Sequence, residues 1–259
     1  MIKRHRIFTK VGIMNVIFIT SSIYTNKSIF TPVQRISKTV NTFKSIKKKL
    51  PNSYLIFIES STSDLNPHWK DFIKMYVDDY VELFDYKELV KYQEIAKDLK
   101  HEFVKPTLNT VFGKTRNLSE SFAMIKGLEY FTNKKTLKNI TRCYKISARY
   151  VVSEFFNPAF HSNNKFTFVK AKKSYLPTEI CQVPYYYNTK FFSWNPKETE
   201  YLTNIYKKVL NTLILTYMNK KYADIDHLFW EHIGPEKIYH VNFIGIKGYK
   251  GTIGHFSHE

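Results

Sequence analysis

Two cationic side chains and a hydroxyl alternate along one short apolar segment of the chain. Residues 144–150 read Tyr-Lys-Ile-Ser-Ala-Arg-Tyr, and strand alternation places Lys145, Ser147 and Arg149 on one face. Because burying two unpaired positive charges is costly, such a face is expected to meet an anion, such as a diphosphate or a carboxylate. Arg149 suits bidentate contacts with either group. An edge strand with a solvated polar face explains the same pattern, so both interpretations stay open.

Polar residues also end two apolar runs nearer the start of the chain. The first run, residues 14–22, ends in Thr20, Ser21 and Ser22, and its β-branched and aromatic content predicts a strand buried on both faces. Glu59 follows a second such run. Open parallel sheets bind ligands beyond the carboxyl ends of their strands, and an acid after the second strand commonly accepts hydrogen bonds from a ribose. We therefore expect a ligand site at this edge, with an ordinary loop carboxylate as the alternative for Glu59.

The chain contains a single Asp-x-Asp, formed by Asp224 and Asp226. Carboxylates are the ligands that divalent cations such as Mg²⁺ prefer. The pair stands where a helix is expected to begin, and Asp is favoured there for capping and because of the helix dipole. Capping is the interpretation that we favour. The chain has no Gly-x-Gly-x-x-Gly after its first strand and no P-loop, which disfavours dinucleotide and Walker-type sites.

The order of the hydrophobic patterns predicts an α/β fold in which helices cover a mostly parallel sheet. A helix over residues 33–50 joins apolar strands at 14–22 and 54–58, and the three form a right-handed βαβ unit. Further elements follow along the chain. The predicted helices lie at 69–77, 87–100, 117–131, 197–220 and 224–232, and the predicted strands at 79–85, 140–152, 166–169, 181–187 and 238–246.

The helix predicted at 117–131 has a start signal of its own. Asn117 is placed as its N-cap, and Glu120, three residues later, completes something like a capping box. The preceding residues 105–116 contain Pro, Asn and Gly, so we expect a loop there.

Composition predicts one globular domain with an excess of positive charge. The chain has 259 residues, of which 43% are apolar and 17% aromatic, and its net charge is +18. Such a charge points to nucleic acid, anionic lipid or phosphorylated substrates. No acid precedes Glu59, an asymmetry that can steer an anionic ligand to one side of the molecule. Only six of the 40 basic residues are arginines, however, and the lysine excess is also what an AT-rich genome produces without selection for binding.

Other features of the sequence bear on the cellular compartment. No run is long enough to span a bilayer. Residues 3–6 are basic and precede an apolar run, as in a signal peptide, but Asn15 interrupts that run and no small-residue cleavage site follows. The two cysteines, Cys143 and Cys181, form neither a disulfide framework nor a metal motif. We therefore expect a protein of a reducing compartment, the cytoplasm.

The order of these segments resembles that of glycosyltransferase-like proteins found in large DNA viruses, phages and some bacteria, which have the GT-A, nucleotide-diphospho-sugar transferase fold. The matching segments are 15–22, 30–51, 55–61, 119–121, 145–150 and 241–248. The resemblance implies a mixed, mostly parallel sheet flanked by helices. It also implies one domain over residues 14–259, preceded by a basic extension at 1–13, and a location in the host cytoplasm if the protein is viral.

The resemblance further implies transfer of a sugar from a nucleotide-sugar donor to a glycan or other acceptor. The implied nucleotide-binding residues are Thr20, Ser21, Ser22, Arg35 and Glu59, and the implied catalytic residues near the sugar diphosphate are Glu120, Lys145 and Arg149. Lys247 would lie in a terminal Gly/Lys loop that closes over the site.

The metal site departs from the pattern of the resemblance. GT-A enzymes usually hold Mn²⁺ or Mg²⁺ with an Asp-x-Asp at the end of a central strand, whereas the comparable strand here ends in Ser-Ala-Arg. The remaining metal candidates are Asp224, Asp226 and His240, the last from a terminal His/Gly/Lys pattern similar to that of some retaining glycosyltransferases but differently spaced. The alternative is a metal-independent site for the leaving group, built on Lys145, Arg149 and Lys247.

Two other classes of function stay open beside the transferase. A basic nucleic-acid-binding protein of a virus or phage would explain the charge, but the sequence contains no recognised nucleic-acid module and therefore disfavours it. A transferase-like protein that binds nucleotide sugars without turning them over would explain the missing Asp-x-Asp.

Overall fold

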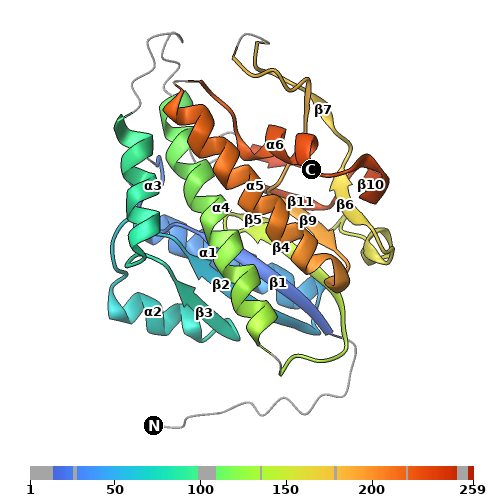
Figure 1. The fold of residues 1–259 in the computed structure, drawn as a ribbon. Helices are drawn as coiled ribbons and strands as arrows, with labels where there is room; N and C mark the ends of the chain where they lie inside the picture. The colour runs from blue at the N-terminus through green and yellow to red at the C-terminus, as the bar shows by residue number, and fades with distance from the viewer. Residues whose placement is uncertain are drawn as a thin grey trace.

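A mixed sheet forms the centre of the molecule (Figure 1). The computed structural model describes residues 14–25, 28–98, 109–134, 136–177, 180–219, 221–249 and 256–259. Within them, seven strands are ordered β10-β6-β9-β4-β1-β2-β3. Their bounds are β1 Met14–Ser21, β2 Ser53–Glu59, β3 Asp79–Glu82, β4 Ile140–Ser147, β6 Phe166–Val169, β9 Phe191–Trp194 and β10 Ile238–Val241. Strands β1 to β4 are parallel, and β9 runs antiparallel to both β4 and β6. The predicted fold class, mixed and mostly parallel, is confirmed.

The first strand pair and its crossover helix follow from local sequence. Residues 16–19 of β1 are 0–1% exposed, which explains their unbroken apolar character. Helix α1 (Pro32–Lys49) begins with a capping box, in which the Thr31 hydroxyl accepts from the Gln34 amide and the Gln34 side chain accepts from the Thr31 amide. Three lysines in its last turn complement the helix dipole. The predicted strand–helix–strand unit is therefore present.

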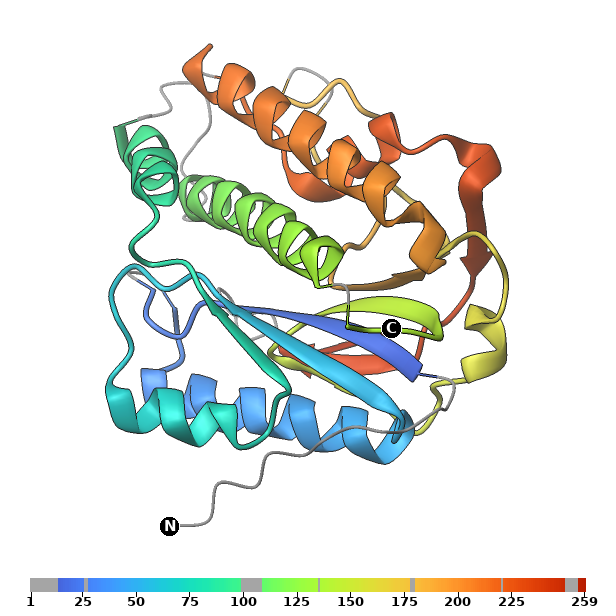
Figure 2. The same cartoon turned by 60° about the horizontal axis from the view of Figure 1, so that its bottom comes forward.

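Helices cover both faces of the sheet (Figure 2). One face packs against α1 and α2 (Pro67–Lys74), and the other against α3 (Lys87–Asp98), α4 (Asn109–Asn133), α5 (Thr199–Met218) and α6 (Ile225–His232). Alternate residues of β1 divide between the two cores, since Ile17 and Ile19 face α1 while Val16 and Phe18 face α4. Among the helices that the structure describes, none has the length and hydropathy needed to cross a membrane.

Two smaller sheets complete the described structure. A three-stranded sheet is ordered β12 (Phe256–His258), β11 (Ile246–Tyr249), β5 (Tyr150–Val152), and β7 (Lys172–Lys173) pairs with β8 (Tyr185–Tyr186). Short 3₁₀ helices span Pro158–His161, Pro196–Glu198 and Pro235–Lys237.

Several predicted strands differ from those observed. The runs predicted at 140–152 and 238–246 are each divided between the main sheet and the small sheet, because the chain turns at residues 148–149 and 242–245. The run predicted at 181–187 is reduced to β8, since Pro184 lacks the amide hydrogen that a ladder requires.

The expected loop and helix start before residue 117 are wrong. Helix α4 already includes residues 109–116, and Asn117 is 1% exposed in its interior, where its side-chain amide donates to the Tyr217 hydroxyl at 3.2 Å. Packing of α4 along α5 therefore outweighs the local helix-breaking residues. Residues 105–108 lie outside the described residues, as does the basic extension predicted at 1–13.

Candidate functional site

The carboxyl ends of β1, β2 and β4 meet at one edge of the sheet. The Ser21 carbonyl accepts from the Ser60 amide at 2.9 Å, and the Thr20 carbonyl accepts from the Ala148 amide at 2.9 Å. Helix α1 follows β1 and helix α4 precedes β4, so both helices point their N-termini toward this edge. The polar ends of these strands therefore lie close together, at the edge where an α/β sheet binds ligands, and the expected ligand site there stays a prediction.

Thr20, Ser21 and Ser22 lie at this edge, but their polar groups serve the loops around it. Thr20 is 7% exposed, and the Ser22 hydroxyl donates to the Tyr24 carbonyl at 3.3 Å. The main contribution of this segment is therefore to hold neighbouring loops in place.

Glu59 is buried at the end of β2. Its carboxylate accepts from the Ile23 amide at 2.9 Å and from the Ser61 hydroxyl, and it thereby fastens the loop after β1. Burial raises the pKa of Glu59, while the Ser61 hydrogen bond opposes the rise. One carboxylate oxygen, Oε2, has no hydrogen-bond partner among the described residues. The structure gives Glu59 a role in the loop, and its contact with a ribose stays a prediction.

Helix α1 contributes two cations to the edge. Arg35 is 7% exposed, and its Nη1 donates to the Ser28 hydroxyl at 2.9 Å, while its buried Nε has no partner among the described residues. Lys38, one turn further on, places its Nζ over the Phe30 ring at 4.4 Å and the Tyr249 ring at 4.2 Å. Sequence reasoning missed Lys38, although its spacing from Arg35 on α1 was available as a signal.

Arg149 lies in the turn between β4 and β5, directly beside α1. The Thr42 hydroxyl of α1 lies 2.7 Å from the Tyr150 carbonyl and 3.0 Å from the Ala148 carbonyl, and the single hydrogen that these acceptors share fixes the turn against the helix. A Cβ atom added to Gly248 of β11 would lie 2.5 Å from the Arg149 carbonyl, so this approach requires glycine. Arg149 therefore does not share a strand face with Lys145 and Ser147 as expected, because the chain leaves the main sheet before it reaches Arg149.

Arg35, Lys38 and Arg149 form what we call the cationic cluster. Burial and the charge of Arg149 lower the pKa of Arg35 to about 10, and desolvation and the same charge lower the pKa of Lys38. Burial also lowers the pKa of Arg149, and so does the charge of Arg116. A positive charge that lowers the pKa values of its cationic neighbours favours an anion close by. The negative charges that oppose these shifts are those of Glu59, which raises the pKa of Arg35, and Glu120, which raises the pKa of Arg149.

Lys145 and Glu120 form an ion pair beneath the cluster. Lys145 is 0% exposed; besides Glu120 it contacts the Ser147 hydroxyl at 3.1 Å and the Thr189 carbonyl at 2.7 Å. The prediction that Lys145 and Ser147 share a face is confirmed, and the solvated edge strand is wrong because β4 lies between β1 and β9. Burial by itself would raise the pKa of Glu120. The positive charges of Lys145 and Arg116 outweigh burial and hold this pKa below its usual value. Glu120 is therefore ionised at neutral pH.

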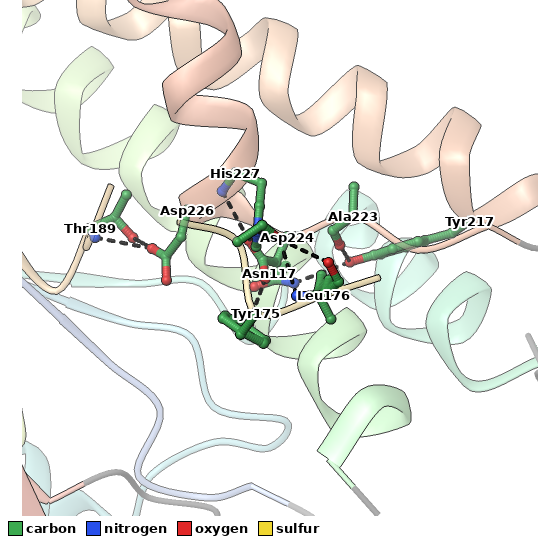
Figure 3. Close-up of polar contacts among 10 residues, drawn as sticks. Asn117, Tyr175, Leu176, Thr189, Tyr217, Ala223, Asp224, Asp226 and His227 are labelled. Carbon is green, nitrogen blue, oxygen red and sulfur yellow. Dashed lines mark hydrogen bonds and ion pairs between the residues drawn. The ribbon is translucent and has the colours of Figure 1, made fainter. Parts of the chain in front are cut away.

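Asp226, at the start of α6, contacts Thr189 (Figure 3). Its carboxylate accepts from the Thr189 amide at 3.0 Å and from the Thr189 hydroxyl. Burial raises the pKa of Asp226, and the charge of Asp224 raises it further. Because the Thr189 carbonyl accepts from Lys145, Thr189 connects Asp226 with the Lys145–Glu120 ion pair.

Asp224 caps helix α6, as the sequence favoured. Its Oδ1 accepts from the His227 amide at 3.0 Å and lies 2.7 Å from His227 Nδ1, and its Oδ2 accepts from the Tyr175 hydroxyl at 3.0 Å (Figure 3). His240 lies on β10, with its ring against that of Tyr187. In the part of the chain that the structure describes, no group of three or more His, Cys, Asp or Glu side chains could hold a metal ion. Asp224, Asp226 and His240 therefore do not form a ligand set.

Lys247 belongs to strand β11 and not to a closing loop. Its Nζ lies 2.9 Å from the Glu154 carboxylate, so its charge is engaged away from the cationic cluster. The neighbours of Lys247 approach the cluster instead, Gly248 through its backbone and Tyr249 through its ring. The expected loop is a strand at Lys247, and a contact of Lys247 with a nucleotide stays a prediction.

Comparison with known proteins identifies the class of fold. No family model and no curated protein sequence matches the chain. Among solved structures, the galactosyltransferase LgtC in complex with donor and acceptor sugar analogs aligns with a TM-score of 0.50 and 8% identity, over 88% of this chain and 73% of LgtC. A structure of LgtC with a substitution in its active site aligns with a TM-score of 0.51 and 8% identity, over 88% of this chain and 72% of LgtC. The chain therefore has the α/β fold of GT-A glycosyltransferases, as the resemblance in sequence predicted.

Proposed function

We propose that this protein is a glycosyltransferase that moves a sugar from a nucleotide-sugar donor to a glycan or other acceptor. The GT-A fold supports the proposal, and the cationic cluster at the carboxyl edge of β1 and β4 carries it. A buried guanidinium nitrogen without a partner among the described residues, Arg35 Nε, points to an anionic ligand at this edge. The diphosphate of a nucleotide sugar is such an anion, and it accumulates charge when the sugar departs.

In this proposal, different residues stabilise the developing charges and accept the proton. When the bond between the sugar and the diphosphate breaks, the electron pair remains on the diphosphate oxygen, and Arg149 stabilises it through two N–H groups. Glu120 is ionised and held by Lys145, so it can stabilise positive charge that develops on the sugar. If the configuration inverts, a carboxylate must also accept the proton of the acceptor hydroxyl. Asp226, with its raised pKa, is the stronger base of the two.

Thermal-shift measurements with a panel of nucleoside diphosphates and nucleotide sugars test the proposal. A binding nucleotide should raise the midpoint of unfolding in a concentration-dependent manner. Arg149→Ala should abolish the shift, whereas Lys44→Ala, an exposed lysine on the same helix as Arg35, should leave it unchanged. If no nucleotide or nucleotide sugar stabilises the protein, the proposal is wrong.

Release of nucleoside diphosphate from the donor that binds best separates a transferase from a binding module. Turnover should occur with a suitable acceptor and, more slowly, with water. Binding without release of the diphosphate from any donor would support a protein that only binds nucleotide sugars.

A further inference from the structure

We propose that Arg35, Lys38 and Arg149 bind the donor diphosphate directly and that no divalent metal ion takes part. This inference rests on the proposed function. It extends that function by stating which groups neutralise the diphosphate, and it assigns a role to Lys38 and to the two aromatic rings that hold it.

The side chains at the end of β4 do not fit a divalent cation. Ser147 and Arg149 stand at the strand end, and neither supplies a carboxylate. The Ser147 hydroxyl is already 3.1 Å from the ammonium of Lys145. The charge of Lys145 is compensated by Glu120, so a cation at this strand end would be repelled by Arg149, whereas a phosphate there would be attracted by it.

The backbone brings the three cations of the cluster to one place. Arg35, Lys38 and Thr42 share a stripe of α1 at spacings of three and four residues. Thr42 is the residue whose hydroxyl holds the turn on both sides of Arg149. The stripe therefore leads from the turn toward the N-terminus of α1, where the helix dipole adds further positive potential.

Lys38 is held in position before any ligand binds. Its ammonium lies over the rings of Phe30 and Tyr249, which restrict its rotamers without neutralising its charge. Tyr249 follows Gly248, whose backbone packs against the Arg149 carbonyl. One strand, β11, thereby positions Lys38 through a ring and Arg149 through its backbone, so the two cations are preorganised relative to each other.

A guanidinium and an ammonium can replace the electrostatic role of a metal ion. Arg149 offers a planar pair of donors that matches phosphate oxygens, and Lys38 acts as a compact point charge. Arg35 is largely buried, and its Nε–H has no partner among the described residues, so it can bind a phosphate oxygen without losing its bond to Ser28. Unlike a bound metal ion, these charges are insensitive to chelators.

Isothermal titration calorimetry with EDTA or with Mn²⁺ tests the inference. The probes are UDP, GDP, CDP, ADP and inorganic pyrophosphate, each titrated into the full chain. We expect at least one nucleotide to bind in EDTA, with a Kd that changes less than about threefold when Mn²⁺ replaces EDTA. In EDTA, Arg149→Ala and Lys38→Ala should each weaken binding by at least tenfold, Arg149→Lys should be intermediate, and Lys44→Ala should match the wild type.

The outcomes separate this inference from the proposed function. Nucleotide binding that requires Mn²⁺, or that survives both alanine variants in EDTA, overturns the metal-free site while the transferase proposal stands. If no probe binds in EDTA or Mn²⁺, both proposals fail. A wild-type circular dichroism spectrum and a midpoint of unfolding within a few degrees of wild type establish that a variant is folded. If Arg149→Ala does not fold, Arg149→Lys is compared with the wild type instead.

Discussion

Lys145 is a fully buried charge, and we predict that Lys145→Met destabilises the protein strongly. The side chain is 0% exposed and has three partners, namely the Glu120 carboxylate, the Ser147 hydroxyl and the Thr189 carbonyl. Methionine fills a similar volume, so the substitution removes the charge and the hydrogen bonds with little change in packing. What remains is an ionised Glu120 that has lost its ammonium partner and retains only the charge of neighbouring arginines such as Arg116.

The size of the effect follows from the burial of the pair. Removing one partner of a buried ion pair costs roughly 3–5 kcal/mol, because the other charge stays desolvated. The Glu120 side chain is 17% exposed, so water can solvate the remaining carboxylate and reduce this free-energy cost. We therefore expect about 3 kcal/mol, plus about 1 kcal/mol for the Thr189 carbonyl that loses its donor. For a chain of this size the midpoint of thermal unfolding should fall by roughly 8–16 °C.

A double-mutant cycle provides the assay. Urea unfolding of Lys145→Met, Glu120→Gln and the double variant gives the coupling energy between the two side chains, which we expect to be about 1–3 kcal/mol. The double variant should be more stable than Lys145→Met alone, since the unpaired carboxylate is gone. Lys44→Met serves as the control for an exposed lysine. Destabilisation below about 1 kcal/mol by Lys145→Met, or additive single effects, would refute the reasoning.

Three further predictions concern the residues around the cationic cluster. Thr42→Val removes the hydroxyl that the Ala148 and Tyr150 carbonyls share and should cost about 1–3 kcal/mol by urea unfolding, whereas Thr42→Ser should retain most of the stability. Gly248→Ala forces a methyl group against the Arg149 carbonyl, so it should cost about 1–3 kcal/mol and also weaken nucleotide binding; wild-type stability would contradict the close approach. The folded pKa of Glu120 lies below its usual value of 4.5, so its stabilising contribution is fully present above that pH and is lost as the pH falls through the lower folded pKa. Acid unfolding of Glu120→Gln should therefore depend less steeply on pH below about 4.5 than that of the wild type, and equal slopes would contradict the assignment.

Local sequence patterns predicted the structure correctly where an element's own side chains determine its conformation. The apolar run of β1, the capping box and lysine-rich end of α1, and Asp224 as the cap of α6 are all encoded by neighbours in sequence. Strand alternation likewise placed Lys145 and Ser147 on one face. Such features depend on backbone hydrogen bonding and periodicity, which short windows contain.

Local sequence patterns gave wrong predictions where contacts with segments distant in sequence outweigh local preferences. Residues 109–116 carry loop-forming residues and yet belong to α4, because α4 packs along α5, far away in sequence. The end of β4 was expected to continue in one strand, but pairing with β11 and the hydroxyl of Thr42 turn the chain at residues 148–149. Lys247 was expected at the site, and a carboxylate from the β5 side, Glu154, engages it instead.

The sequence by itself determined the kind of site this protein can have. The strand ends, the pairing of Lys145 and Arg149 in one segment, and the missing acids at that strand end are properties of composition and order, so they predict a cationic site for an anion. Only the tertiary structure decided which cations lie together. Arg35, Lys38 and Arg149 are brought together by a helix and a turn more than 100 residues apart, held by Thr42 and Gly248. Contacts of that separation depend on how the sheet and helices pack, and no local periodicity encodes them.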